Sequence, residues 1–366
     1  MKILVTGGSG HLGANLVRRL LSEGHSVRCL VRHGSNNRAL DGLSVELVYG
    51  DLRDRATLDA AVQNQERIFH AAAKVSIVEH DRQEVFESNV LGTRNLLEAA
   101  RIAGVGRVVV TGSFSAVGHR RGEPSDESMP FDPFEVVMPY ERSKVHVEHE
   151  VLKAVAEGQD VVIATSCSIL GGNDWKPSRM GRVLCDIANG AMPAYLAGGF
   201  EFVAARDIVE GHFLAMAKGR TGQKYIISTQ SMKIEELFDI YEHVTQMPRP
   251  RWKLPGALML GFSHVSQFLL STFAPQHPQR FTPGAVRVLQ MYRTANTQKA
   301  QQELGFRPSS LEEAIREQYW FFVDLGWIKS AKGERPESQK TTATVAGASS
   351  GKTKPPAIRP AIGERP

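Results

Sequence analysis

The order of apolar and polar residues along the first third of the chain predicts strands that alternate with helices. Short apolar runs predict buried strands at 3–5, 26–31, 45–49, 67–70 and 107–111, and amphipathic stretches predict helices, including a long one over 83–103. Strands and helices that alternate in this way are typical of a parallel sheet covered on both faces. The predicted fold class is therefore α/β, with a doubly wound parallel sheet.

The pattern becomes looser after a predicted helix over 139–156. Further strands are expected at 161–168, 200–207 and 224–227, and helices at 180–189, 208–218, 234–245 and 311–324. We expect a first domain over 1–165 and a smaller lobe over 166–330 that covers the carboxyl ends of the strands and returns segments to the core. Residues 331–366 contain no aromatic residue and are rich in Ser, Thr, Ala, Gly and Pro, which predicts a disordered tail.

The opening residues place a glycine-rich turn between the first strand and the first helix. Gly7, Gly10 and Gly13 follow the strand, and Leu12 and Leu16 begin the apolar face of the helix. Such glycines permit a tight turn and a close backbone approach to a pyrophosphate, which the helix N-terminus stabilises. The pattern indicates a dinucleotide site. A glycine-rich turn without a ligand is the alternative, because the chain contains 33 glycines.

The end of the second strand indicates which dinucleotide binds. An acidic residue there would bind the adenosine ribose hydroxyls of NAD, but the sequence has Arg32, with Arg38 nearby. Arginine suits a 2′-phosphate, so NADP(H) is favoured over NAD(H). A solvated loop arginine is the alternative.

Other predicted strand ends carry residues that suit the same ligand. Asp51 and Leu52 follow the third strand, where a side chain would meet the adenine, and Ala71–Ala73 follow the fourth, where small side chains would let the cofactor pass. His70 is expected to be a packed strand-end residue. Ligands of doubly wound sheets bind at the carboxyl ends of the strands, so Gly10, Arg32, Ala72 and Ser113 are expected to lie near one another.

Tyr140 and Lys144 lie four residues apart in the helix predicted over 139–156, and hence on one helix face. A phenol ordinarily titrates near pH 10, and a neighbouring ammonium together with an oxidised nicotinamide would bring its pKa down. Tyr140 would then exchange a proton with a substrate oxygen, which Ser113 would also bind. An exposed Tyr and Lys on a solvated helix face are the alternative.

Composition and charge narrow the classes of protein and of binding partner that fit the sequence. The net charge is +5, but residues 331–366 hold seven Lys or Arg and three acidic residues, so the rest is nearly neutral and a nucleic-acid partner is not expected. Three cysteines in apolar contexts fit reduced thiols in a cytoplasmic protein, and no metal-binding motif occurs. The N-terminus has no signal-peptide pattern. Residues 254–273 favour a buried or interfacial helix over a membrane span, which leaves a peripheral membrane contact open.

Together these motifs carry a family resemblance. Thr6-Gly7-x-x-Gly10-x-x-Gly13, Asp51-Leu52, Ala71–Ala73, Asn89, Ser113 and Tyr140-x-x-x-Lys144 resemble the extended short-chain dehydrogenase/reductase superfamily over about residues 1–328. Within it, the chain is most similar to the dihydroflavonol-4-reductase-like and 3β-hydroxysteroid-dehydrogenase-like branch, including hopanoid-associated bacterial members. Stretches at 173–174, 192–195, 202–207 and 303–308 support that placement.

The resemblance implies a Rossmann-like fold, a nicotinamide cofactor and a catalytic set of Ser113, Tyr140 and Lys144. The cofactor-binding residues that it and the motifs indicate are Gly7, Gly10, His11, Leu12, Gly13, Arg32, Asp51, Leu52, Ala71, Ala72, Ala73, Asn89, Tyr140 and Lys144. Many members form homodimers through two helices, which here would start near Gln83 and Tyr140. Ser166 replaces a common proline and Ala204 a frequent histidine, which weakens any transfer of substrate identity.

The predicted function is an NADP(H)-dependent oxidoreductase that reduces a ketone, or oxidises a secondary alcohol, on a largely apolar or aromatic small molecule. Candidate pocket residues are Phe114, Val137, Met138, Ile169, Trp175, Met180, Tyr195 and Phe200, although ordinary core packing is expected for about half of them. One alternative is an NAD-dependent nucleotide-sugar 4-epimerase or dehydratase, in which Lys176, Arg179 and Arg182 would bind a diphosphate. A non-catalytic NADP-sensing regulator is another.

Overall fold

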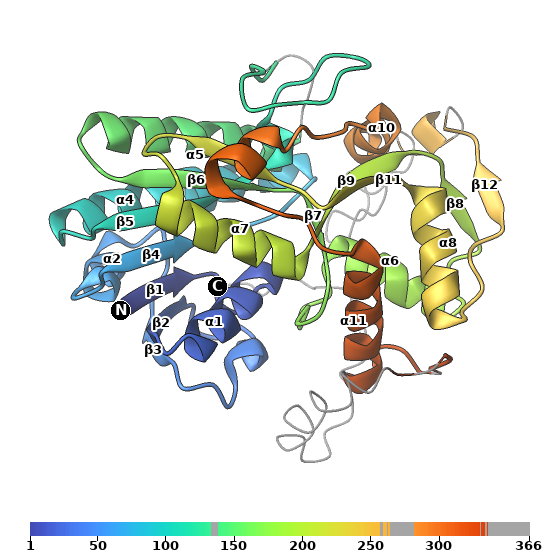
Figure 1. The fold of residues 1–366 in the computed structure, drawn as a ribbon, viewed down its shortest axis with the longest axis horizontal. Coiled ribbons are helices and arrows are strands. Elements are labelled where there is room, and N and C mark those ends of the chain that lie inside the picture. The colour runs from blue at the N-terminus through green and yellow to red at the C-terminus, as the bar shows by residue number, and fades with distance from the viewer. Residues whose placement is uncertain are drawn as a thin grey trace.

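The computed structural model describes residues 1–132, 138–256, 259–261, 263, 282–329, 331–333 and 335. Its centre is a seven-stranded parallel sheet in the order β10-β6-β5-β4-β1-β2-β3 (Figure 1). The strands are β1 Lys2–Thr6, β2 Ser26–Val31, β3 Glu46–Tyr49, β4 Arg67–His70, β5 Arg107–Ser113, β6 Val161–Ser166 and β10 Lys224–Ile227. This confirms the predicted α/β fold. The chain changes direction across the sheet between β1 and β4, which is where ligands of such folds bind.

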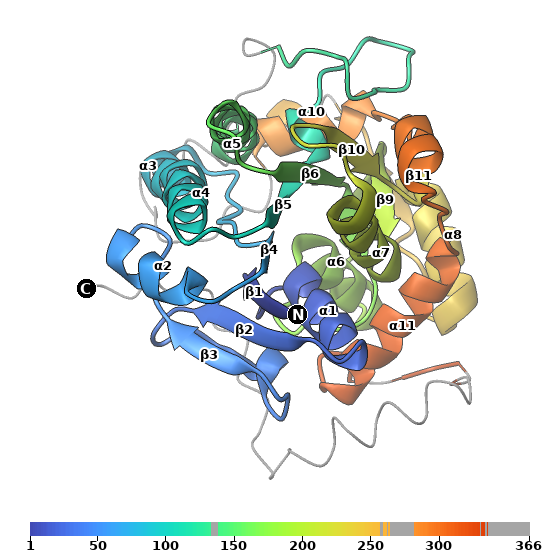
Figure 2. The same ribbon diagram turned by 60° about the vertical axis from the view of Figure 1, so that its left-hand side comes forward.

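Helices cover both faces of the sheet (Figure 2). One face carries α2 (Arg55–Val62), α4 (Gly92–Ile102) and α5 (Pro139–Ala156), and the other carries α1 (His11–Ser22) and α7 (Ala205–Lys218). Leu58, Leu96 and Val147 fill the first interface, and Leu16 and Ile208 help to fill the second. These apolar faces are removed from water and thereby hold the strand ends in fixed positions.

A smaller lobe lies beside the carboxyl ends of the central strands (Figure 1). It contains a three-stranded sheet, β11-β9-β7, and a two-stranded sheet, β12-β8. Its elements are β7 Ser168–Leu170, α6 Arg179–Ala188, β8 Ala194–Leu196, β9 Gly199–Ala204, β11 Gln230–Lys233, α8 Ile234–Thr245, β12 Trp252–Leu254, α10 Pro283–Met291 and α11 Leu311–Asp324. Buried aromatic residues such as Phe202, Phe238 and Tyr319 form its core. Strand β10, which interrupts the lobe in sequence, belongs to the central sheet.

Two predicted elements are divided in the structure. The helix expected over 83–103 consists of α3 (Arg82–Phe86), a π-helical turn (Glu87–Leu91) and α4. The strand expected over 161–168 ends at Ser166, and the chain enters the lobe sheet as β7, which pairs with β9. The widened turn directs Asn89 inward, where its amide is hydrogen bonded, and such turns recur at functional sites.

Some sequence predictions fall outside the described residues. They are pocket residue Val137, most of the 254–273 stretch and nearly all of the tail over 331–366. Within the described part of the chain, no helix combines the length and the apolar content that a bilayer crossing requires.

Candidate active site

Ser113, Tyr140 and Lys144 come together at the carboxyl end of β5. Ser113 is the last residue of β5, and α5 begins at Pro139, whose fixed φ suits the first helical position. The Tyr140 hydroxyl is hydrogen bonded to the Ser113 side chain. The Lys144 ammonium nitrogen lies 5.9 Å from the centre of the Tyr140 ring. A strand end and one face of a helix therefore position all three groups.

The Lys144 ammonium is buried, with 6% of the residue exposed. It donates a hydrogen bond of 2.8 Å to the carbonyl oxygen of Thr111, two residues before Ser113 in β5. Burial lowers the pKa of Lys144 to about 8, while the charge of Glu148 acts in the opposite direction. An ammonium has three donors, so Lys144 keeps the capacity to bind a further acceptor beside Tyr140.

Two buried histidines flank Lys144 and are neutral. Burial, and then the charge of Lys144, lowers the pKa of His70 to about 3. Burial likewise lowers the pKa of His212 to about 4. The His70 ring bridges the hydroxyls of Thr6 (2.6 Å) and Thr93 (2.9 Å). As the sequence predicted, His70 is a packed strand-end residue, and neither ring is a proton donor at neutral pH.

The pKa of Tyr140 differs from the sequence-based expectation. Burial raises it, the hydrogen bond from Ser113 lowers it, and the charge of Glu141 raises it further. The expected lowering by Lys144 does not offset this burial, because the ammonium donates to Thr111 instead. In this environment Tyr140 is a neutral phenol, which suits a proton donor more than a base.

Asn89 supports the start of α5 from the neighbouring helix. Its side-chain nitrogen donates to Ser143 Oγ at 2.9 Å, and Ser143 Oγ donates to the carbonyl oxygen of Tyr140 at 2.7 Å. Its side-chain oxygen also accepts a 2.7 Å bond from the backbone N–H of Lys74. Asn89 thus links the segment after β4 to the turn that carries the candidate proton donor.

The glycine turn lies at the neighbouring end of β1 and fits a dinucleotide. A Cβ on Gly13 would lie 2.1 Å from the carbonyl oxygen of Gly7. Gly7 has a φ of +74°, and a Cβ there would lie 2.7 Å from the backbone nitrogen of Ala72. No side chain caps the N-terminus of α1 at Gly10, so its amides remain available to a phosphate.

The other predicted cofactor residues lie around this turn. Ala71 and Ala72 are held against β1 by hydrogen bonds to Thr6, and Leu12 is buried in the core. Leu52 packs against Gly92 of α4. Both carboxylate oxygens of Asp51 accept 2.9 Å hydrogen bonds from Arg53, which lowers the pKa of Asp51. Asp51 is therefore a paired carboxylate.

The segment 171–178, which we call the strap, crosses α1 beside the glycine turn. The His11 ring nitrogen Nε2 lies 3.1 Å from the carbonyl oxygens of both Gly171 and Gly172. Trp175, predicted to line the substrate pocket, belongs to the strap and faces two arginines. Arg18 Cζ is 5.8 Å and Arg38 Cζ 6.0 Å from its ring centre. The Trp175 ring also packs edge to face against Phe321, with 5.2 Å between ring centres, so aromatic and cation–π contacts both hold it.

Several other candidate pocket residues belong to the core. Met180, Tyr195 and Phe200 pack against the lobe core, and Ile169 packs against the main core. Phe114 follows Ser113 directly, and Arg293 Cζ lies 4.8 Å from its ring centre. Of the two family departures, Ser166 lies beside Ser113 in the β5–β6 register and Ala204 is fully buried at the end of β9.

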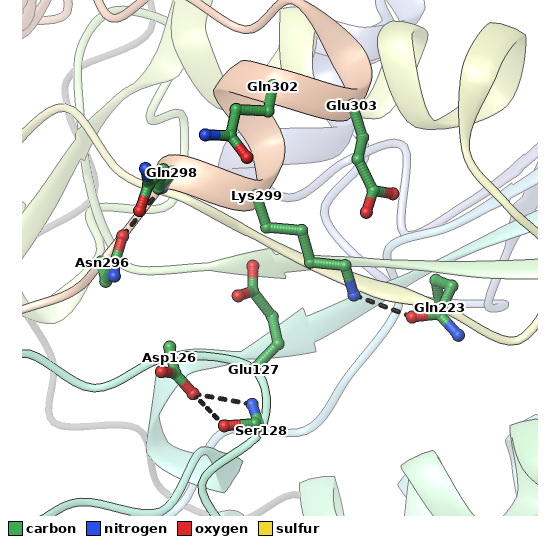
Figure 3. Close-up of a pocket in the computed structure, with 9 residues that line it drawn as sticks. All are labelled: Asp126, Glu127, Ser128, Gln223, Asn296, Gln298, Lys299, Gln302 and Glu303. Carbon is green, nitrogen blue, oxygen red and sulfur yellow. Dashed lines mark hydrogen bonds between the residues drawn. The ribbon is translucent and has the colours of Figure 1, made fainter.

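A separate hollow of about 420 Å³ lies along edge strand β10 (Figure 3). Its lining is polar: Asp126, Glu127, Ser128, Gln223, Asn296, Gln298, Lys299, Gln302 and Glu303. Lys299 donates a 2.8 Å bond to Gln223, and Glu127 accepts one of 2.8 Å from the backbone of Ile226. These side chains join the loop after β5 to residues 296–303, and none belongs to the candidate catalytic set.

Sequence reasoning missed three contributors to the site. The carbonyl of Thr111, the ring of His212 and the guanidinium of Arg293 all lie at the carboxyl end of β5; Arg293 donates to the carbonyl oxygen of Val117. A backbone acceptor has no signal in the residue type. His212 and Arg293 lie far from β5 in sequence, and only the folded chain brings them there.

Comparison with known proteins agrees with this geometry. The sequence profile of the NAD dependent epimerase/dehydratase family matches residues 3–228. Sterol demethylase protein B of Methylococcus capsulatus is 42% identical over 328 residues, covering 90% of this chain and all of that protein. A putative dihydroflavonol 4-reductase of Synechocystis is 35% identical, with 89% of this chain and 96% of that one covered.

The fold recurs in solved structures. A dTDP-glucose 4,6-dehydratase from Streptomyces venezuelae with NAD bound superimposes with a TM-score of 0.73 at 24% identity, covering 90% of this chain and 99% of that chain. At this identity the likeness concerns the fold alone. Together with the profile match, the relatives confirm the extended short-chain dehydrogenase/reductase resemblance and its dihydroflavonol-reductase-like branch.

Proposed function

Because this chain belongs to the NAD-dependent epimerase/dehydratase family, we propose that it is an NADP(H)-dependent oxidoreductase that reduces a ketone, or oxidises the corresponding alcohol, on a largely apolar small molecule. One observation carries the proposal. Tyr140 is hydrogen bonded to Ser113 and its ring faces the buried ammonium of Lys144, two strands away from the end of β1 that bears the glycine turn. This arrangement suits proton transfer to a carbonyl oxygen.

The residues of the proposed active site have distinct roles in the reaction. A bound nicotinamide cofactor supplies or accepts the hydride. In reduction, Tyr140 gives its phenolic proton to the substrate oxygen, and Ser113 donates a hydrogen bond to the same oxygen. The Lys144 ammonium stabilises the phenolate that remains, and Thr111 holds that ammonium in place. In oxidation the same groups act in reverse.

The cofactor preference and the substrate class have separate support. Arg32 follows β2 where an acid would serve NAD, which favours the 2′-phosphate of NADP(H). The names of the relatives, sterol demethylase protein B and dihydroflavonol 4-reductase, indicate polycyclic or aromatic substrates with few charges. Phe114 and Met138 adjoin Ser113 and Pro139 in sequence and offer apolar surface at the catalytic end.

Hydride transfer from NADPH and from NADH to a panel of steroid, flavonoid and terpenoid ketones tests the proposal. We expect turnover with NADPH that the variant Tyr140→Phe lowers by about a thousandfold, because general acid catalysis contributes on that order. Tyr49→Phe, at a tyrosine 49% exposed on β3, is the matched control. Unchanged turnover in Tyr140→Phe would remove Tyr140 from the mechanism. Purified protein that retains stoichiometric, non-exchanging NAD would instead support a nucleotide-sugar epimerase.

A further inference from the structure

The strap brings a lysine of the lobe to the glycine turn. Lys176 Nζ lies 3.4 Å from Ser9 Oγ, and Ser9 stands between Gly8 and Gly10. Lys176 also lies close enough to Arg32 for the arginine charge to lower its pKa, an effect smaller than that of burial. The strap therefore holds a cation at the glycine turn, within the range at which its charge and that of Arg32 repel each other.

The strap is fastened so that Lys176 is held there. Besides the His11 contacts, Asn15 Nδ2 donates a 3.0 Å bond to the carbonyl oxygen of Gly172, and Asn173 Nδ2 donates one of 3.0 Å to Asn15 Oδ1. Trp175, next to Lys176, packs between Arg18 and Arg38. These contacts fix the backbone that leads to the lysine, which lowers the entropy lost when an anion binds.

Within the described part of the chain, neither cation forms an ion pair with a carboxylate, although the charge of Arg32 contributes to lowering the pKa of Asp51. The nearby carboxylates are engaged elsewhere: Asp51 is paired with Arg53, and both oxygens of Asp174 accept bonds from the backbone N–H of Ser178 at 3.0 and 2.9 Å. The 3.4 Å contact with Ser9 uses one weak bond of an ammonium that has three donors. Like charges held together in this way favour an anion between them.

We infer that Lys176 and Arg32 together bind the adenosine 2′-phosphate of NADP(H), with Ser9 at the base of the site. The inference rests on the proposed function, because it deepens the cofactor preference stated there. It assigns a cofactor role to a residue of the strap, so that binding of NADP(H) joins the lobe to the first domain. Ser9 lies in the glycine turn, which would also bind the cofactor pyrophosphate, so binding of the two anions has to be measured separately.

Calorimetric titration of the full chain with NADP⁺, NAD⁺, 2′,5′-ADP and 5′-AMP makes this separation. For Lys176→Met we expect about a tenfold or greater loss of affinity for NADP⁺ and 2′,5′-ADP, as for one charge-assisted hydrogen bond. Affinity for NAD⁺ and 5′-AMP should stay within about twofold. Lys176→Arg should restore most of the loss, and Lys2→Met, the same charge change at the amino end of β1, should cause none.

The double variant Arg32→Met/Lys176→Met provides a second measurement. If both cations bind one phosphate, the combined loss for NADP⁺ differs from the product of the single losses, because contacting groups are not additive. Thermal unfolding of each variant shows whether it is folded.

Two outcomes would overturn the inference: unchanged affinity for NADP⁺ in Lys176→Met, or equal losses for NADP⁺ and NAD⁺, which would place the ammonium on the pyrophosphate. A wild-type protein that binds both cofactors equally would overturn the NADP preference of the proposed function. The Tyr140 experiment would still test the chemistry.

Discussion

The two ends of the proposed cofactor site differ in whether their charged side chains are buried or reach solvent. At the catalytic end, around Ser113 and Tyr140, the Lys144 ammonium is buried and flanked by two neutral histidines. At the proposed adenosine end, Arg32 is exposed, and Lys176 reaches solvent although partial burial lowers its pKa. Burial strengthens electrostatic effects and shifts pKa values, whereas exposed charges are screened by salt. The catalytic end is therefore suited to proton transfer, and the adenosine end to selecting a ligand.

The largest effect expected from this difference is that of Lys144→Met. Loss of the ammonium should lower the rate of hydride transfer from NADPH by about a hundredfold or more. The same change should raise the free energy of unfolding, because a buried ammonium is replaced by an apolar side chain of similar length. Stopped-flow absorbance and urea unfolding measure the two quantities.

Lys153→Met provides the control on the same helix, since the Lys153 side chain is 61% exposed and pairs with Glu150. The rate of hydride transfer by Lys153→Met should stay within about twofold of the wild-type rate, because this variant removes only a surface ion pair. An equally large loss of affinity for 2′,5′-ADP in Lys144→Met would contradict the separation of the two ends.

Burial at the catalytic end can be tested at Glu141, because the titration of this buried carboxyl makes the free energy of unfolding depend on pH. Glu141 is 3% exposed and its Oε2 accepts no hydrogen bond, and burial raises its pKa to about 7, against the opposing charge of Arg293. The folded protein keeps this proton up to about pH 7, whereas the unfolded chain loses it near its ordinary pKa of about 4.5. The contribution to stability is therefore full below pH 4.5 and is lost as the pH rises through 7.

Glu141→Gln should remove this dependence. At pH 8 the variant should be more stable than the wild type by on the order of 2 kcal/mol, and the difference should shrink as the pH falls toward 4.5. Urea unfolding at a series of pH values measures it. Glu123→Gln, at an exposed side chain, should give a curve parallel to the wild type. A constant difference between Glu141→Gln and the wild type would show that the carboxyl does not titrate in this range.

The smallest effect concerns Arg38, which faces Trp175 at the adenosine end. Arg38→Leu should weaken binding of NADP⁺ by only about threefold, because an exposed cation–π contact contributes about 0.5–1 kcal/mol. The loss should fall as the ionic strength is raised toward about 0.5 M. Calorimetry at two salt concentrations measures it, with Arg82→Leu, an exposed arginine on α3, as the control. A loss independent of salt would indicate packing rather than charge.

Much of the fold could be predicted because the central sheet is locally encoded. β2, β4, β10 and α5 have the predicted bounds, and β1 agrees within one residue at each end, since each is a short apolar run or a helix with a clear start. The strands of the lobe were harder to predict, because β8, β11 and β12 are only three or four residues long and depend on partners far along the chain.

The sequence predicted those parts of the candidate site whose side chains belong to recognisable motifs. Ser113, Tyr140 and Lys144 lie together as the sequence indicated, and the glycine turn has the tight geometry that its spacing implies. Trp175 is a residue whose surroundings no motif indicated. An aromatic residue in a lobe suggested a substrate contact, but Trp175 packs edge to face against Phe321 of α11 and faces Arg18 and Arg38, which are all distant from it in sequence.

The position of β10 has a consequence for synthesis on the ribosome. The central sheet ends at β6 until residues 224–227 have emerged, so the nascent first domain exposes an unpaired hydrophobic edge while about 60 further residues are translated. An open edge of this kind is a template for wrong pairing with another chain. A fragment that stops before residue 224 should therefore aggregate where the full chain folds, which makes β10 a requirement for the solubility of the part of the central sheet that precedes it.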